Sequence, residues 1–125
     1  MSKVYFGSNI KANNNSLTGD TFKGNFKNNL THVYTMPNGL TNISSLFYGC
    51  SNLKTVGYEL EDGLIDISNV FYGCKNFSKD IQIPYSVENA SNAFRGSNVK
   101  NAIFLENGNK ANTLDLHIVF INVII

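Results

Sequence analysis

Two histidines and one acidic stretch are the first side chains in the sequence that could take part in metal binding or catalysis. His32 and His117 stand alone, because neither belongs to an H-x-x-x-H or H-E-x-x-H motif or to a Cys/His cluster. The densest acidic stretch is Glu59, Glu61 and Asp62. A carboxylate pair for general acid–base catalysis needs apolar surroundings that shift one pKa, and the sequence gives no sign of them. We therefore expect ordinary histidines and a charged turn, with a metal site on the acidic stretch as the weaker alternative.

The two cysteines could form a disulfide, bind a metal or act as nucleophiles. Cys50 and Cys74 occupy equivalent places in two copies of an internal repeat, unlike an independent disulfide framework or a C-x-x-C metal site. Since free cysteine packs as a small apolar side chain, we expect two buried thiols. The sequence contains no G-x-G-x-x-G, G-x-x-x-x-G-K-[ST] or G-x-S-x-G motif. These observations predict a protein that is not an enzyme and holds no metal and no cofactor.

Length, charge and composition narrow the class further. A chain of 125 residues, 42% of them hydrophobic, is long enough for one domain with one core. The formal net charge of +1 gives no strong field to attract nucleic acid or an anionic membrane, so we expect no nucleic-acid partner; membrane insertion is not expected either, for the reason given below for the C-terminal segment. The first residues contain no continuous apolar segment, so we expect no signal peptide. The twenty asparagines are typical of AT-rich genomes and indicate a low-GC bacterium or its phage.

An internal repeat organises the chain. Its anchors are three phenylalanines spaced by 24 and 23 residues, each preceded by apolar residues at spacings of three and followed two positions later by glycine. A partial fourth copy comes first, and segments 30–37 and 99–106 overlay 77–84 without gaps. The predicted interior positions of the repeat are Phe47, Phe71 and Phe94, then Cys50 and Cys74, then Leu53, Phe77 and Val99.

Each copy of the repeat predicts two elements. The spacing of three before each phenylalanine predicts a helical or 3₁₀ turn that glycine ends. Alternating apolar residues predict short strands near 34–36, 58–60, 81–83 and 103–105. One strand and one helical turn in about 23 residues cannot bury their own apolar face, so neighbouring copies must stack.

The predicted fold class is therefore an α/β solenoid, a right-handed stack of about four repeats that forms one domain. Residues 30–106 contain the repeats. Residues 1–29 form an N-terminal cap with a strand near Val4 and a degenerate first coil, and residues 107–125 form a C-terminal capping strand or docking tail.

Several motifs resemble known repeats. The pattern I-x-I-P-x-S-V-x-x-A-x-x-A-F-x-G at 81–96 resembles the BspA-like leucine-rich repeats of bacterial surface and phage proteins, and LFYGCSNLKTV and VFYGCKNF are similar to the same family's A-F-x-x-C-x-x-L segment. The resemblance covers about three-fifths of the chain. The opening KVYFGSNIKA resembles a phrase that begins many tail-associated proteins of phages of low-GC Gram-positive bacteria. The departures from the repeat pattern are Leu46 and Val70 for Ala, Glu61 and Glu106 for Pro, and Ser97 for Cys.

Two surfaces are candidates for binding. If Tyr34, Met36 and their equivalents point inward, alternation turns the residues between them outward on the sheet face, which could also be plain solvated sheet. The candidate binding residues on this face are Val33, Thr35, Glu59, Asp80, Gln82 and Phe104. A second candidate row, each residue directly after a repeat phenylalanine, is Tyr48, Tyr72 and Arg95.

The C-terminal segment TLDLHIVFINVII is too short and too interrupted to span a bilayer, which takes about 20 apolar residues. Its alternation predicts a strand, folded onto the last repeat or paired with a second copy or a partner. The candidate docking residues are Ile118, Phe120, Val123 and Ile125.

The resemblance implies a non-enzymatic leucine-rich-repeat structural or binding protein displayed on a phage particle, as a tail or baseplate appendage or a capsid decoration. Such a protein would mediate assembly or host-surface contact. Its expected partners are other virion proteins or a host-surface molecule, and a homo-oligomer through the terminal strand is possible. The alternative is an adhesion module on the bacterial cell surface.

Overall fold

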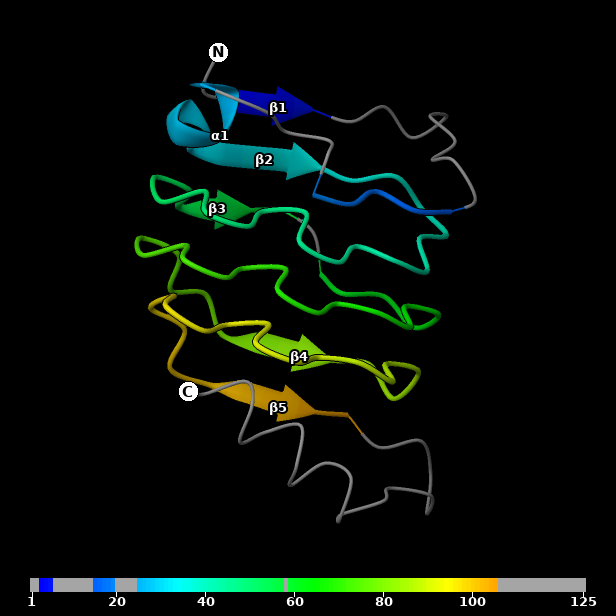
Figure 1. Ribbon diagram of the computed structural model, residues 1–125. Helices are drawn as coiled ribbons and strands as arrows, with labels where there is room; N and C mark the ends of the chain where they lie inside the picture. Colours follow the sequence, from blue (N-terminus) through cyan, green and yellow to red (C-terminus); the bar gives the residue numbers. More distant parts are fainter. Residues whose placement is uncertain (1–2, 6–14, 20–24, 58, 106–125) are drawn as a thin grey trace.

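The structure is a computed structural model of the 125-residue chain, and it describes residues 3–5, 15–19, 25–57 and 59–105. Three strands form one parallel sheet in the order β1-β2-β3, and two further strands, β4 and β5, form a second parallel sheet (Figure 1). The elements are β1 (Lys3–Tyr5), α1 (Asn25–Asn29), β2 (His32–Thr35), β3 (Thr55–Val56), β4 (Ile81–Ile83) and β5 (Ala102–Phe104).

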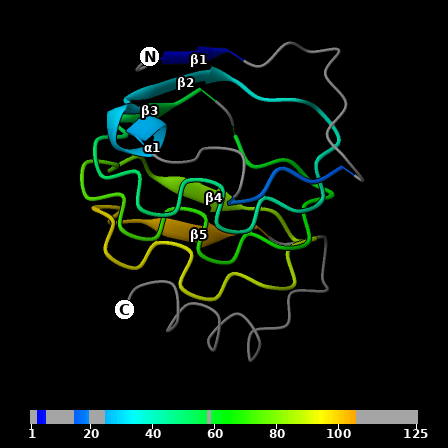
Figure 2. The same ribbon diagram turned by 45° about the horizontal axis from the view of Figure 1, so that its top comes forward.

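Copies of the sequence repeat lie beside one another in space. We name three units after their central phenylalanines: the Phe47 unit (36–54), the Phe71 unit (59–80) and the Phe94 unit (84–101). Parallel bridges join Asn42 to Asp66 and Asp66 to Asn89, so equivalent residues of successive units are neighbours. Figures 1 and 2 show the same arrangement from two directions, with the strands all running one way and the units stacked in chain order.

The backbone around each phenylalanine alternates between two kinds of hydrogen bond. In the Phe47 unit, the N–H groups of Ile43 and Ser45 donate to the carbonyl oxygens of Asp66 and Ser68 in the next unit, at 3.0 and 2.8 Å. The N–H of Leu46, the residue after Ser45, donates instead to the carbonyl of Ile43 in its own unit, at 3.1 Å. The backbone is therefore satisfied partly by tight turns and partly by the neighbouring unit.

No helix forms in these units, and the predicted α/β solenoid of repeated strand and helical turn is wrong. Ser45, Asn69 and Asn92 have φ values of 58°, 57° and 55°, and a left-handed residue interrupts a right-handed helix. The apolar spacing of three instead reflects successive tight turns, each of which returns one side chain to the core. Among the described residues α1 is the one helix, and it lies outside the three units.

The core is a column of stacked aromatic rings. Phe47, Phe71 and Phe94 are 1%, 2% and 4% exposed, and the ring centroids of successive members are 5.5 and 5.8 Å apart. The ring of Phe77 stacks on that of Phe71 with the centroids 4.2 Å apart. Leu53 is buried as well, while the smaller side chain at the third equivalent position, Val99, is partly buried against the core.

The strands after the second and third units present their side chains differently. In β4 Ile81 and Ile83 are buried and the residue between them is exposed, as the alternation predicts. In β5 the expected faces are reversed, because Ile81 pairs with Ala102 and not with Ile103. The gapless overlay of 77–84 on 99–106 is therefore wrong by one residue. Such a slip exchanges the two faces of a strand, which leaves Ile103 58% exposed.

The first sheet departs from the predicted strand positions as well. Val33, expected on the outer face, is fully buried and pairs with Val56, because β3 lies three residues before the predicted segment 58–60. The N–H of Gly57 donates to the carbonyl of Val33, and a Cβ at Gly57 would collide with the carbonyl oxygen of Tyr34. The close approach of these two strands therefore requires glycine at this position.

The ends of the chain are described in part. The strand expected near Val4 is present as β1, which pairs in parallel with β2 and extends the first sheet. Within the described ranges, no helix is long and apolar enough to cross a membrane. The predicted tail 107–125, with Ile118, Phe120, Val123 and Ile125, lies outside the described residues.

Candidate binding surfaces

The sheet face predicted to bind a partner is only partly assembled. Thr35, Glu59, Asp80 and Gln82 are exposed, but Val33 is buried and Phe104, expected as the large apolar anchor, is partly buried against the core. Phe104 is covered because of the one-residue slip in β5. The face thus lacks its predicted apolar centre.

Charged groups on the same face are engaged within the chain. The carboxylate of Glu59 lies 2.6 Å from Nζ of Lys79, which also donates to the carbonyl of Val56. The carboxylate of Asp80 accepts a hydrogen bond from Nδ2 of Asn101 at 3.2 Å. The bond from Lys79 to Val56 joins the segment before β4 to β3 of the other sheet, and the bond from Asn101 to Asp80 joins the Phe94 unit to the Phe71 unit, so both support the stack.

The second predicted row forms a continuous feature. The rings of Tyr48 and Tyr72 stack with their centroids 4.7 Å apart and their planes within 8°. Tyr48 is 43% exposed, and Tyr72 is half-buried. Nζ of Lys27 lies 5.5 Å from the centre of the Tyr48 ring, a favourable cation–π distance. Arg95 follows Phe94 at the equivalent position of the third unit and is exposed.

Local sequence explains why these side chains align. Each follows a buried phenylalanine and precedes a glycine, and the glycines of successive units contact one another so closely that a Cβ at Gly73 would lie 3.6 Å from Cα of Gly49. Gly49 and Gly73 have φ values of 73° and 74°, which glycine adopts without strain. The turns therefore superpose, and the residues before the glycines form a column.

A feature that the sequence analysis missed is the gathering of cations along this side of the stack. Each lies at α1 or between a repeat phenylalanine and the following strand, so the parallel stacking brings them to the edge where the strands begin. Lys79 lies there too but is paired with Glu59, and we call the remaining cations the basic edge: Lys27, Lys54, Lys75, Arg95 and Lys100. No fixed position in the repeat marks these cations, and the net charge of +1 conceals them.

The other groups considered for chemistry occupy ordinary positions. Nδ1 of His32 lies 2.8 Å from the hydroxyl oxygen of Thr31, and the imidazole stacks on Tyr34 with the ring centroids 5.8 Å apart. Glu61 and Asp62 are exposed, and the described residues contain no group of three or more His, Cys, Asp or Glu that could hold a metal ion. His117 lies outside the described residues.

Both cysteines are free thiols in the core. Burial raises the pKa of Cys50 to about 11, and burial likewise raises the pKa of Cys74, whose Sγ donates to the carbonyl oxygen of Phe47 at 3.0 Å. Neither thiol is therefore activated as a nucleophile, since the thiolate is the reactive form. In the third unit Ser97 takes the equivalent place and donates to the carbonyl of Phe94 at 2.7 Å.

The described surfaces thus combine a partly self-paired sheet face with a stacked pair of tyrosines, exposed at Tyr48 and half-buried at Tyr72, beside a basic edge. No protein-family model matches the chain, and no curated protein or solved structure is similar enough to count as a match.

Proposed function

We propose that this protein is a non-enzymatic structural and binding protein of a phage particle, displayed as a tail or baseplate appendage or as a capsid decoration. The observation that carries the proposal is the stacking of equivalent surface residues in register. Tyr48 and Tyr72, one unit apart in the sequence, form a single column in which Tyr48 is exposed and Tyr72 half-buried. Repeat proteins commonly use such extended surfaces to bind partners.

The sequence supports the location on a phage. The pattern at 81–96 resembles repeats of phage and bacterial surface proteins, and the opening segment 3–12 resembles the start of tail-associated phage proteins. We therefore propose other virion proteins or a host-surface molecule as the partners. The repeat resemblance alone also fits a bacterial adhesion module, which is the second candidate.

Particle composition separates the two candidates. Virions purified by density-gradient centrifugation are analysed by quantitative mass spectrometry, with the major capsid protein as the reference for copy number. We expect peptides of this chain at a fixed ratio to the capsid protein, and antibody-labelled particles in electron micrographs then distinguish tail from capsid. Recovery of the chain in the cell-envelope fraction of uninfected bacteria, and not in particles, would contradict the phage location and favour the adhesion module.

A further inference from the structure

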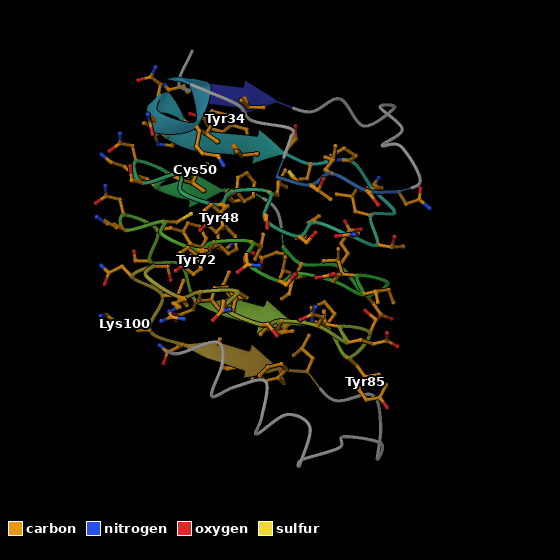
Figure 3. All side chains as sticks on the ribbon, viewed as in Figure 1. Tyr34, Tyr48, Cys50, Tyr72, Tyr85 and Lys100 are labelled. Atoms are coloured by element: carbon orange, nitrogen blue, oxygen red, sulfur yellow. The ribbon has the colours of Figure 1, made fainter. Side chains whose placement is uncertain are left out.

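The basic edge carries positive charge that the rest of the described structure does not neutralise. The side chains of Lys54, Lys75, Arg95 and Lys100 are exposed, and Lys27 is half-buried beside Tyr48. The one ion pair among the described residues joins Glu59 to Lys79, which lies two residues before β4, as Lys100 lies two residues before β5, so Lys79 shares the edge but is already paired. Figure 3 shows Lys100 at the edge where the strands begin, with Tyr48 and Tyr72 one below the other toward the same side.

The cations are distributed along the stack and not clustered at one point. Lys27 belongs to α1, Lys54 to the Phe47 unit, Lys75 to the Phe71 unit, and Arg95 and Lys100 to the Phe94 unit. Neighbouring parallel strands lie about 5 Å apart, so one or two cations occur at each such step along the edge. A ligand that fits this pattern is itself linear and carries negative charge at regular intervals.

We propose that the basic edge binds a linear polyol phosphate, a polymer of small alcohols joined by phosphodiesters, which runs along the stack. Lysine and arginine side chains are the usual protein partners of phosphate oxygens. The polymer would contact a cation in each of the three units and in α1.

The tyrosines favour this polymer over single-stranded nucleic acid. Proteins that bind single strands offer aromatic ring faces on which bases stack. Here the rings of Tyr48 and Tyr72 stack on each other, and Lys27, which lies on the preceding side of the glycine column, covers Tyr48. Both faces of the Tyr48 ring and one face of the Tyr72 ring are therefore occupied. A polymer without bases does not need free ring faces, so its binding is not weakened by these contacts.

This inference specifies a ligand for the proposed host-surface contact. It rests on the proposed function only in taking the host surface as the natural source of the polymer. The binding itself is measured on purified full-length protein. Isothermal titration calorimetry with poly(glycerol phosphate) as the probe gives the affinity at several salt concentrations. An oligothymidylate of matched phosphate number serves as the nucleic-acid arm.

The salt dependence reports the number of phosphates contacted. With a slope of about −0.7 per neutralised phosphate, five cations predict a slope of log affinity against log salt of about −3.5, or on the order of 100-fold weaker binding on raising salt fourfold. Replacing two exposed cations in Lys75→Gln/Arg95→Gln should flatten the slope to about −2, since three contacts remain.

A matched control carries the same change in net charge at a distance from the edge. Asn38→Asp/Gln82→Glu adds two negative charges at exposed positions, one in the loop after β2 and one on β4. We expect the control to keep the wild-type slope. All four substituted residues are exposed, and circular dichroism spectra of both variants verify that the fold is unchanged.

Three results would overturn the inference. One is the absence of salt-dependent binding to poly(glycerol phosphate), and another is an equal loss of slope in the edge variant and the control. The third is tenfold tighter binding of oligothymidylate, which would assign the edge to nucleic acid. Because virion location is measured separately, failure of polymer binding leaves the phage location standing, and absence from virions leaves a positive binding result intact.

Discussion

The ring of Phe71 is the central contact of the aromatic column, so its replacement tests the packing directly. Phe71 stacks on Phe47, Phe77 and Phe94, whereas Phe94 has one such partner among the described residues, Phe71 itself. We choose Phe71→Leu and Phe94→Leu because leucine keeps most of the apolar volume and removes the ring. Alanine would leave a large cavity and risk unfolding the domain.

The expected loss follows from the number of ring pairs. Each aromatic pair contributes about 0.5–1.5 kcal/mol beyond the burial of its area. Phe71→Leu removes three pairs, so we expect the free energy of unfolding to fall by about 2 kcal/mol or more. Phe94→Leu removes one pair and should cost about 0.5–1 kcal/mol.

Urea unfolding followed by far-UV circular dichroism measures both losses. With a slope of about 2 kcal/mol per molar urea, the midpoint should fall by about 1 M for Phe71→Leu and by less than half of that for Phe94→Leu. Equal slopes for the wild type and both variants would show that the midpoints are comparable. A loss for Phe94→Leu as large as that for Phe71→Leu would refute the central position of Phe71 in the column.

Three further changes test other contacts by the same unfolding assay. Gly57→Ala should cost about 1–3 kcal/mol, because its Cβ would collide with the carbonyl oxygen of Tyr34; a variant as stable as the wild type would contradict this close strand approach. Burial raises the pKa of the Cys50 thiol from 9.0 to about 11. Above pH 9 the thiol ionises in the unfolded chain but not in the folded one, so the free energy of unfolding should fall by about 2–3 kcal/mol as the pH approaches 11. Unfolding measured from pH 8 to pH 11 should show this loss in the wild type and a smaller one in Cys50→Ala, and identical pH curves would argue against a buried thiol. Asp66→Ala removes the acceptor of hydrogen bonds from the backbone N–H and the hydroxyl of Ser68, at 2.9 and 2.7 Å, and should cost about 1–2 kcal/mol. Asp66→Asn keeps an acceptor for the N–H and should cost less than half as much; an equal cost would assign the effect to the lost charge.

The repeat and its core column could be predicted from the sequence because burial imposes a simple rule. When equivalent segments stack, each buried position must be apolar in every copy, and Phe47, Phe71 and Phe94 satisfy this rule at spacings of 24 and 23 residues. The period therefore reveals which residues share a column even where the conformation between them is misjudged. Cys50 and Cys74 were placed in the interior by the same reasoning.

The local conformation could not be predicted because a spacing of three is ambiguous. A helical turn and a succession of tight turns both return every third side chain to one side. The feature that decides between them is the left-handed backbone at Ser45, Asn69 and Asn92. Asparagine adopts this conformation more readily than most residues, but serine and asparagine also occur on helix surfaces, so the residue types alone did not exclude a helix.

The candidate surfaces depended on register, which small differences in length between copies obscure. β2 and β3 pair at a separation of 23 residues and β4 and β5 at 21, as the pairs His32 with Thr55 and Ile81 with Ala102 show. A strand exchanges its faces with each one-residue shift, so the overlay that placed Ile103 inward failed there although it set the apolar Ile103 and Leu105 on Ile81 and Ile83.

The basic edge was missed for a related reason. Positions along the edge tolerate shifts of one or two residues, because the long side chains of Lys54, Lys75 and Lys100 reach a common surface from slightly different places. No strict sequence period marks them, and the net charge averages them with acidic residues elsewhere. What places the cations together is the rule that every unit begins its strand at the same side of a parallel stack. Charge on a repeat protein is therefore better examined unit by unit, relative to the strands, than as a sum over the chain.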